Sequence, residues 1–205
     1  MKYLDNIELI YYINLDHRQD RLDHIKQVIS DLEFDPLKVF RISGTYIPEN
    51  GSLGCAISHV EAIENFLSSK KSNCLVLEDD FNFYDKDRFI SSISSFFQSD
   101  CSWDIIQLSS NLLRHEPTSY KNISRVLESQ TTSGYLLNSN FAKTLLDCFI
   151  ESKEHLLSGY ILEYCIDQNW KKLQEKNKWF CFNPQLGYQI DGYSDIENGI
   201  VSYKC

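Results

Sequence analysis

Three consecutive carboxylates, Glu78-Asp79-Asp80, stand at the end of a short uncharged run over residues 73–77. A run of this kind, apolar and β-branched, predicts a buried strand. In an open α/β sheet, ligands bind in the crevice beyond the carboxyl ends of the strands. Carboxylates held there are hard oxygen ligands for Mg²⁺ or Mn²⁺, bound together with a substrate's phosphates. A solvated acidic turn would explain the isolated triplet equally well.

Length and composition predict one α/β domain over residues 1–205. With 205 residues, of which 42% are hydrophobic and 13% aromatic, the chain can bury a sizeable core. Its formal net charge of −9 argues against a nucleic-acid-binding protein, because such proteins usually carry a basic surface. An anionic substrate is still allowed, because a bound metal ion can reverse the local charge.

The N-terminus and the cysteines indicate a compartment. The first residues contain no apolar segment typical of a signal peptide, and no apolar stretch is long enough to span a bilayer as a transmembrane segment. The seven cysteines are dispersed and form no CxxC pair. This pattern favours free thiols in a cytoplasmic or otherwise reducing compartment. No Cys/His cluster has the spacing of a zinc site, so we expect none.

Hydrophobic periodicity predicts alternating strands and helices. The predicted strands cover residues 8–14, 37–42, 73–77, 103–108, 124–128, 131–137 and 179–182, with a hairpin at 124–137. The predicted helices cover residues 18–32, 54–67, 87–97, 139–149 and 162–173. Candidate N-caps are Asp16 for the first helix, Ser52 for the second, and Asn138 or Ser139 for the fourth. Residues 109–120 are predicted to be a loop, and residues 185–205 a flexible or lid-like tail.

The first strand, helix and strand predict a βαβ unit, in which the strands are parallel and the crossover right-handed. Residues 14–21, 43–44 and 78–80 follow the first three strands and should therefore meet at one edge of the sheet. Arg18 and Arg21 lie near the start of a helix, where cations oppose the helix dipole unless an anion binds there. Pairing with neighbouring aspartates on the surface is the alternative.

Five segments, in order, resemble motifs of glycosyltransferase family 25, which includes lipooligosaccharide and procollagen galactosyltransferases. They are residues 13–21 (INLDHRQDR), 51–59 (GSLGCAISH), 75–80 (LVLEDD), 132–135 (TSGY), and 184–189 with 194–196 (PQLGYQ and SDI). Each motif is weak alone, but their order and spacing agree over about residues 8–196.

The resemblance implies a GT-A-like fold, a Rossmann-like nucleotide-sugar transferase fold whose mixed, mostly parallel sheet is flanked by helices. It implies transfer of a sugar with inversion, typically galactose from UDP-galactose and alternatively glucose from UDP-glucose, with Mn²⁺ or Mg²⁺ as cofactor. The acceptor would be a hydroxyl group of a glycan, a lipid-linked glycan, or a glycosylated or hydroxylated peptide. A nucleotide-sugar-binding module without activity and a metal-dependent phosphohydrolase are the alternatives.

Residue by residue, the resemblance implies that Asp80 binds the metal, with Glu78 directed to the ribose or to a metal-bound water. Asp79 would be mainly structural beside the donor. In the tail, Asp191 and Asp195 are candidates for a further metal ligand or for closing over the donor. The remaining donor-binding residues implied are Ile13, Asn14, Leu15, Arg18, Arg21, Ser43, Gly44, Ser58, His59, Ser133 and Gly134. Taken singly, a histidine such as His59 is more often structural than catalytic.

An inverting reaction requires a general base that takes the proton of the acceptor hydroxyl during in-line attack. Asp167 is the candidate, with Glu163 one turn earlier on the same face of the predicted helix 162–173. Members of the family carry an acidic residue near this helix. Plain solvation of both carboxylates is the alternative.

Overall fold

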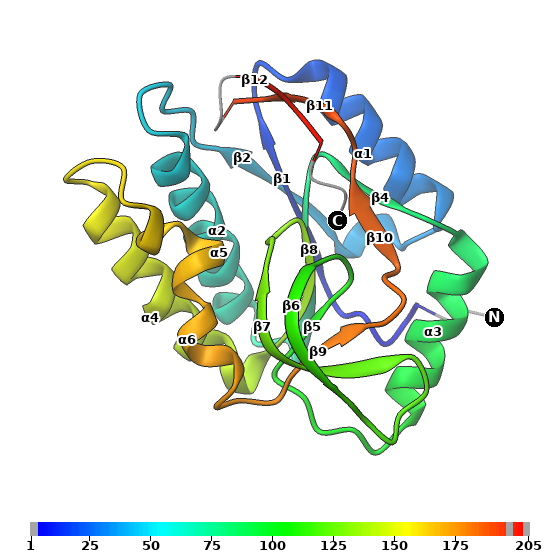
Figure 1. Ribbon diagram of the computed structural model, residues 1–205. Coiled ribbons are helices and arrows are strands. Elements are labelled where there is room, and N and C mark those ends of the chain that lie inside the picture. The colour runs from blue at the N-terminus through cyan, green and yellow to red at the C-terminus, as the bar shows by residue number, and fades with distance from the viewer. Residues whose placement is uncertain (1–3, 196–198, 203–205) are drawn as a thin grey trace.

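One eight-stranded sheet organises the computed structural model, which describes residues 4–195 and 199–202 (Figure 1). In spatial order its strands are β2 (Val39–Gly44), β1 (Ile10–Leu15), β3 (Asn73–Glu78), β8 (Gly134–Asn138), β5 (Ile105–Gln107), β9 (Trp179–Phe182), β7 (Ile123–Gln130) and β6 (Asn111–Pro117). Strands β7 and β8 run antiparallel to their neighbours, and the others share one direction. The sheet is therefore mixed and mostly parallel.

Helices cover both faces of this sheet (Figure 1). On one face lie α1 (Gln19–Asp31) and α3 (Lys86–Gln98), and on the other lie α2 (Gly51–Ser69), α4 (Ser139–Leu156), α5 (Ile166–Asn169) and α6 (Lys171–Gln174). Two 3-10 helices, η1 (Pro36–Lys38) and η2 (Leu162–Tyr164), join elements. None of the helices in the described ranges combines the length and the hydropathy needed to cross a membrane.

Strand β3 shows why the run before the acidic triplet is uncharged. Cys74 and Val76 belong to the apolar core beneath α2 and α4, whereas Leu75 and Leu77 belong to the core beneath α1 and α3. All four side chains are fully buried, because successive residues of a strand point to opposite faces and both faces are covered by helices. The run contains no charged residue because β3 lies within the sheet and is covered by helices on both faces.

The predicted βαβ unit is confirmed. β1 and β2 pair in parallel from Ile10 with Val39 to Leu15 with Gly44, and β3 pairs in parallel on the other side of β1. Helix α1 crosses between the first two strands and buries Ile25, Val28 and Ile29, which recur at helical spacing. The carboxyl ends of three neighbouring strands thus meet at one edge of the sheet.

The predicted loop and hairpin in the middle of the chain are wrong. Residues 111–117 form the edge strand β6, whose side chains are mostly exposed, so its sequence shows no apolar alternation. It pairs with β7, whereas β8 pairs with β3 and β5. The hairpin is therefore β6–β7. Edge strands are held by backbone hydrogen bonds on one side, which explains why their side chains carry little signal.

The predicted helix over residues 162–173 is also wrong, because it is broken into η2, α5 and α6. The break lies at Cys165, whose backbone is extended with φ −55° and ψ 136°. Glu163 and Asp167 consequently do not share a helical face.

The tail contains more structure than its sequence predicts. β10 (Gly187–Gln189) pairs with β4 (Phe81–Phe83), and β11 (Gly192–Ser194) pairs with β12 (Gly199–Val201). Residues 196–198 and 203–205 of the predicted lid lie outside the described residues.

Two predicted caps need correction. Arg18 precedes α1 and gives no side-chain cap, while Asp16 accepts hydrogen bonds from Arg41 and Ser43 instead. Helix α2 is capped by Asn50 in place of Ser52. Oδ1 of Asn50 accepts a 3.2 Å hydrogen bond from the backbone N–H of Leu53. Asn138 caps α4, as predicted.

Candidate active site

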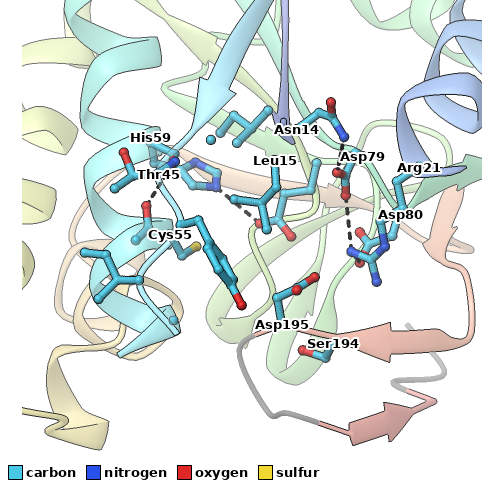
Figure 2. Close-up of a pocket in the computed structure, with 18 of the residues that line it drawn as sticks. Asn14, Leu15, Arg21, Thr45, Cys55, His59, Asp79, Asp80, Ser194 and Asp195 are labelled. Atoms are coloured by element: carbon cyan, nitrogen blue, oxygen red, sulfur yellow. Dashed lines mark hydrogen bonds and ion pairs between the residues drawn. The ribbon is translucent and has the colours of Figure 1, made fainter. Parts of the chain in front are cut away.

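A pocket lies at the edge where β1, β2 and β3 end (Figure 2). Its wall comprises the end of β1, the loop after β2, the first turns of α2, the acidic turn after β3, and parts of the tail. The residues predicted to bind donor or metal that line it are Ile13, Asn14, Leu15, Arg21, Gly44, Ser58, His59, Glu78, Asp79, Asp80 and Asp195. The fold therefore gathers most of the predicted site around one pocket.

Asp79 ties the acidic turn to β1 and α1. Its Oδ2 accepts a 2.7 Å hydrogen bond from Nδ2 of Asn14, and its Oδ1 accepts from Arg21 at 3.2 Å. Arg41 on β2 donates to Oδ1 of Asn14 at 2.9 Å. Burial raises the pKa of Asp79 above its ordinary value, and the Asn14 and Arg21 contacts counteract part of that rise. Asp79 and Asn14 together thus connect the ends of β3 and β1, and Asn14 continues the network to Arg41 on β2.

Asp80 is the least compensated carboxylate of the triplet. Its Oδ2 accepts from Arg21 at 3.0 Å and its Oδ1 from Gln189 at 3.4 Å. Burial and the nearby charge of Glu78 nevertheless raise the pKa of Asp80 to about 7, because they outweigh the attraction of Arg21. An additional cation at this position would favour the ionised form.

Glu78 is held by two donors from different elements. Its Oε1 lies 3.2 Å from Nε2 of His59 on α2 and accepts a 2.7 Å hydrogen bond from the hydroxyl of Thr132. Burial by itself would raise the pKa of Glu78, but the contacts with His59 and Thr132 lower it below its ordinary value. The carboxylate is therefore kept ionised at the floor of the pocket.

The tail is fastened to the start of α1 by arginines. Arg18 donates from Nη1 to Oδ2 of Asp195 at 2.6 Å and to the backbone oxygen of Tyr193 at 3.1 Å. Arg21 donates to the same backbone oxygen at 2.8 Å. Arg18 also forms an ion pair with Asp20 at 2.8 Å, which is the alternative of pairing with a neighbouring aspartate. Arg21 instead forms its ion pair with Asp80 in the acidic turn.

A second cavity adjoins the first. Cys55, Glu78 and Gln189 line both, so the two meet at these side chains. Asp167 lines the second cavity, and burial raises the pKa of its carboxyl group, which accepts from the backbone of Thr131 at 3.4 Å. Glu163 is exposed and does not line either cavity.

The other predicted residues, Ser43, Ser133, Gly134 and Asp191, line neither cavity. The hydroxyl of Ser43 donates to Asp16 at 2.9 Å. The hydroxyl of Ser133 is 2.5 Å from that of Ser109. Gly134 lies against the ring of Phe81, where a Cβ atom would come within 2.4 Å of Cε2. Asp191 is exposed and does not line either cavity.

Sequence reasoning missed several residues that the fold brings to the site. Thr132 contacts Glu78, Gln189 contacts Asp80, and Thr45, Tyr46 and Ile47 line the pocket. Thr132 directly precedes Ser133-Gly134, and Gln189 ends the segment 184–189, so both stood inside segments already singled out. The sequence of the loop after β2 contains no recognisable motif. Only the position of β2 in the sheet shows that Thr45, Tyr46 and Ile47 belong to the pocket.

The acidic turn offers oxygen ligands to a divalent cation. Asp80 and Glu78 supply oxygen ligands of the kind that Mg²⁺ and Mn²⁺ prefer. Burial and the neighbouring charges of Glu78 and Asp79 raise the pKa of Asp80, and Arg21 offsets only part of this rise. Arg18 and His17 contact the two carboxylate oxygens of Asp195, just as Arg21 and Gln189 contact those of Asp80.

Solved structures resemble this fold at low sequence identity. Mannose-1-phosphate geranyltransferase from Thermus thermophilus aligns with a TM-score of 0.53 and 10% identity, over 86% of this chain and 73% of that one. Protein A197 from STIV aligns with a TM-score of 0.51 and 12% identity, over 94% and 92% of the two chains. These likenesses concern the fold alone, which is GT-A-like.

Curated proteins match this chain at higher sequence identity than these solved structures do. Procollagen galactosyltransferase 1-A of Xenopus laevis is 26% identical over 169 residues, which cover 67% of this chain and 28% of the relative. Procollagen galactosyltransferase 1-B of the same organism is 24% identical over the same shares. The chain thus spans little more than a quarter of the length of these curated relatives. The sequence model of glycosyltransferase family 25 (LPS biosynthesis protein) matches residues 49–160, which is more than half of the chain. On this match, the chain belongs to glycosyltransferase family 25.

Proposed function

We propose that this chain is a metal-dependent, inverting glycosyltransferase. It moves a hexose, galactose from UDP-galactose or glucose from UDP-glucose, onto a hydroxyl group of an acceptor. The observation that carries the proposal is the meeting of two cavities at Glu78, one containing the acidic turn and the other containing the half-buried Asp167. Family membership supports glycosyl transfer as the reaction class.

The first cavity is assigned to the nucleotide-sugar donor. Ile13 and Asn14 at the end of β1 line the wall for the uridine, and Arg21 offers a cation to the diphosphate. Asp80 and Glu78 would hold Mn²⁺ or Mg²⁺, whose Lewis acidity stabilises the charge that grows on a departing diphosphate. Asp79 does not contact the donor in this scheme but holds the acidic turn against Asn14.

The second cavity is assigned to the acceptor. Asp167 acts there as the general base that removes the proton of the attacking hydroxyl. Burial suits this task, because a carboxylate with a raised pKa is a stronger base than one in water. Amide side chains of Asn111, Gln130 and Gln168 line the same cavity and can hydrogen-bond to hydroxyl groups.

The acceptor is a glycan, a lipid-linked glycan or a peptide. The six described cysteines are free thiols, which supports a reducing compartment for the protein.

A panel of UDP-sugars tested with Mn²⁺ decides the function. We expect one UDP-hexose to raise the melting temperature of the protein and to release UDP slowly by hydrolysis, and faster with a matched acceptor. If no UDP-sugar shifts the melting temperature, the donor assignment is wrong. Hydrolysis of simple phosphate esters in its place would identify a phosphohydrolase. Donor binding without any turnover would identify a binding module.

A further inference from the structure

We propose that Cys55, His59 and Glu78 form a second cation site, selective for Zn²⁺ and similar thiophilic ions. A thiol, an imidazole nitrogen and a carboxylate oxygen from these residues all lie within 4.8 Å of one another. The three residues line the donor pocket, and Cys55 and Glu78 also line the second cavity. The site therefore stands at the junction of the two cavities and shares Glu78 with the metal site assigned to Asp80.

Helix α2 supplies two of the ligands. Cys55 and His59 are four residues apart and so project from one face of the helix, one turn apart. Figure 2 shows both side chains projecting from this helix at the pocket. Glu78 comes from the end of β3, and its Oε1 is already 3.2 Å from Nε2 of His59. From the sequence we expected no zinc site, because no Cys/His cluster has the required spacing. The third ligand, Glu78, belongs to a different element.

Outer hydrogen bonds orient two of the ligands. Nδ1 of His59 lies 3.0 Å from the hydroxyl of the buried Tyr135, which leaves Nε2 directed at Glu78. The hydroxyl of Thr132 donates to Oε1 of Glu78 at 2.7 Å. Ligating histidines and carboxylates in metal proteins are typically held by such second contacts, which fix the ring orientation. Two of the three ligands, His59 and Glu78, are therefore already held in position before a metal ion binds.

The ligand types decide the selectivity. Thiolate and imidazole favour Zn²⁺, whereas Mg²⁺ and Mn²⁺ favour oxygen ligands. Three protein ligands leave a fourth tetrahedral position, which would face the cavities and take water. On binding, the thiol of Cys55 loses its proton to solvent and its sulfur bonds to the metal. The proton that Nε2 of His59 shares with Glu78 moves to Nδ1, where the hydroxyl oxygen of Tyr135 accepts it, so that Nε2 can bind the metal. No electron is transferred.

The consequence for activity rests on the proposed function. A zinc ion on Glu78 would withdraw this carboxylate from the Mn²⁺ and donor side and would occupy the passage between donor and acceptor. Zn²⁺ is therefore expected to inhibit a Mn²⁺-dependent transfer. The binding itself does not depend on the reaction, so it can be tested separately.

Cobalt spectroscopy tests the site without any substrate. Co²⁺ added to the metal-free protein should produce a thiolate-to-cobalt charge-transfer band, which equimolar Zn²⁺ should abolish. The band should be lost in Cys55→Ser and His59→Gln but kept in Cys165→Ser, a matched control because Cys165 is a half-buried thiol that lines the second cavity. It should also be kept in Asp80→Asn. Absence of the band in the wild type, or its persistence in Cys55→Ser, would overturn the proposal.

Two further measurements complete the test. Tyr135→Phe removes the outer contact to His59 and should weaken Zn²⁺ affinity about 10-fold or more by calorimetry. An unchanged affinity would contradict the orienting contact and with it the prearranged site. In the transfer assay, the ratio of rates with and without Zn²⁺ should be low in the wild type and near one in Cys55→Ser. A cobalt band in a protein that transfers no sugar would refute the proposed function and leave the zinc site standing.

Discussion

Asn14 at the end of β1 donates a 2.7 Å hydrogen bond to the carboxylate of Asp79, and both side chains are buried. The contact joins residues 65 positions apart in the chain. It orients the acidic turn relative to β1, because Asp79 lies between Glu78 and Asp80 and shares their backbone. The positions of Glu78 and Asp80, the two carboxylates assigned to the metal, therefore depend on the side-chain amide of Asn14, which is not itself a proposed metal ligand.

Asn14→Ala should destabilise the protein. The substitution removes a donor from a buried carboxylate, and an unsatisfied buried group costs about 1–3 kcal/mol. Urea unfolding measures the free energy, with Gln19→Ala as a control. Gln19 makes an exposed contact with Asp23 on α1, and its loss should cost less than about 0.5 kcal/mol. Equal unfolding midpoints for the two variants would show that the buried contact contributes nothing.

Asp80→Asn should abolish metal-dependent donor turnover and leave the fold intact. The loss of a charged ligand removes Lewis-acid stabilisation worth several kcal/mol, so UDP release should fall about 1,000-fold. Circular dichroism checks the fold, and coupled UDP detection with and without Mn²⁺ measures turnover. UDP release at the wild-type rate would refute the assignment of Asp80 to the metal.

Asp167→Asn should retain donor binding and lose transfer. The amide keeps the shape of the side chain but cannot accept a proton, and general-base catalysis is worth about 10²–10⁴-fold in rate. Donor affinity from thermal shifts and transfer rate from product analysis separate the two effects. Glu163→Gln is the matched control, because Glu163 is exposed and outside both cavities. A fully active Asp167→Asn protein would place the base elsewhere.

The raised pKa of Asp167 predicts a pH-dependent stability difference between wild type and Asp167→Asn. Burial raises the pKa in the folded state above the ordinary value of 3.8, so the folded protein holds this proton more tightly than the unfolded chain does. The stability contributed by the protonated group is complete below pH 3.8 and is lost as the pH rises through the folded-state pKa. Asp167→Asn should therefore gain stability relative to wild type between acidic and neutral pH. Melting temperatures measured across this range test the sign, and a constant difference would contradict it.

Gly134→Ala should be costly although Gly134 lies in a regular strand. The new Cβ would lie 2.4 Å from Cε2 of Phe81, whose ring is fully buried and has little room to move. Overpacking of this kind costs about 1–3 kcal/mol. Gly192→Ala is the control, because nothing lies within 4 Å of a Cβ at that position. Equal unfolding free energies for both variants would show that the Phe81 ring yields without cost.

The local pattern of apolar and polar residues along the sequence determined the strands and helices that are buried on defined faces. The uncharged run of β3, the apolar face of α1 and the parallel unit of the first strands follow from burial on defined faces, and each was predicted from sequence. Parallel pairing then implied that Asn14, Arg21 and the acidic triplet meet at one edge, and they do. A resemblance of ordered motifs identified the family that the comparisons confirm.

Only the tertiary structure decided contacts between distant segments. The antiparallel strand β8 enters between β3 and β5 and brings Thr132 to Glu78, while β10 brings Gln189 to Asp80. The extended backbone at Cys165 places Asp167 in a cavity without Glu163. Strand pairing uses backbone groups common to all residues, so sequence patterns do not specify which strands become neighbours. For the same reason, Cys55, His59 and Glu78 become a cluster only in the folded chain.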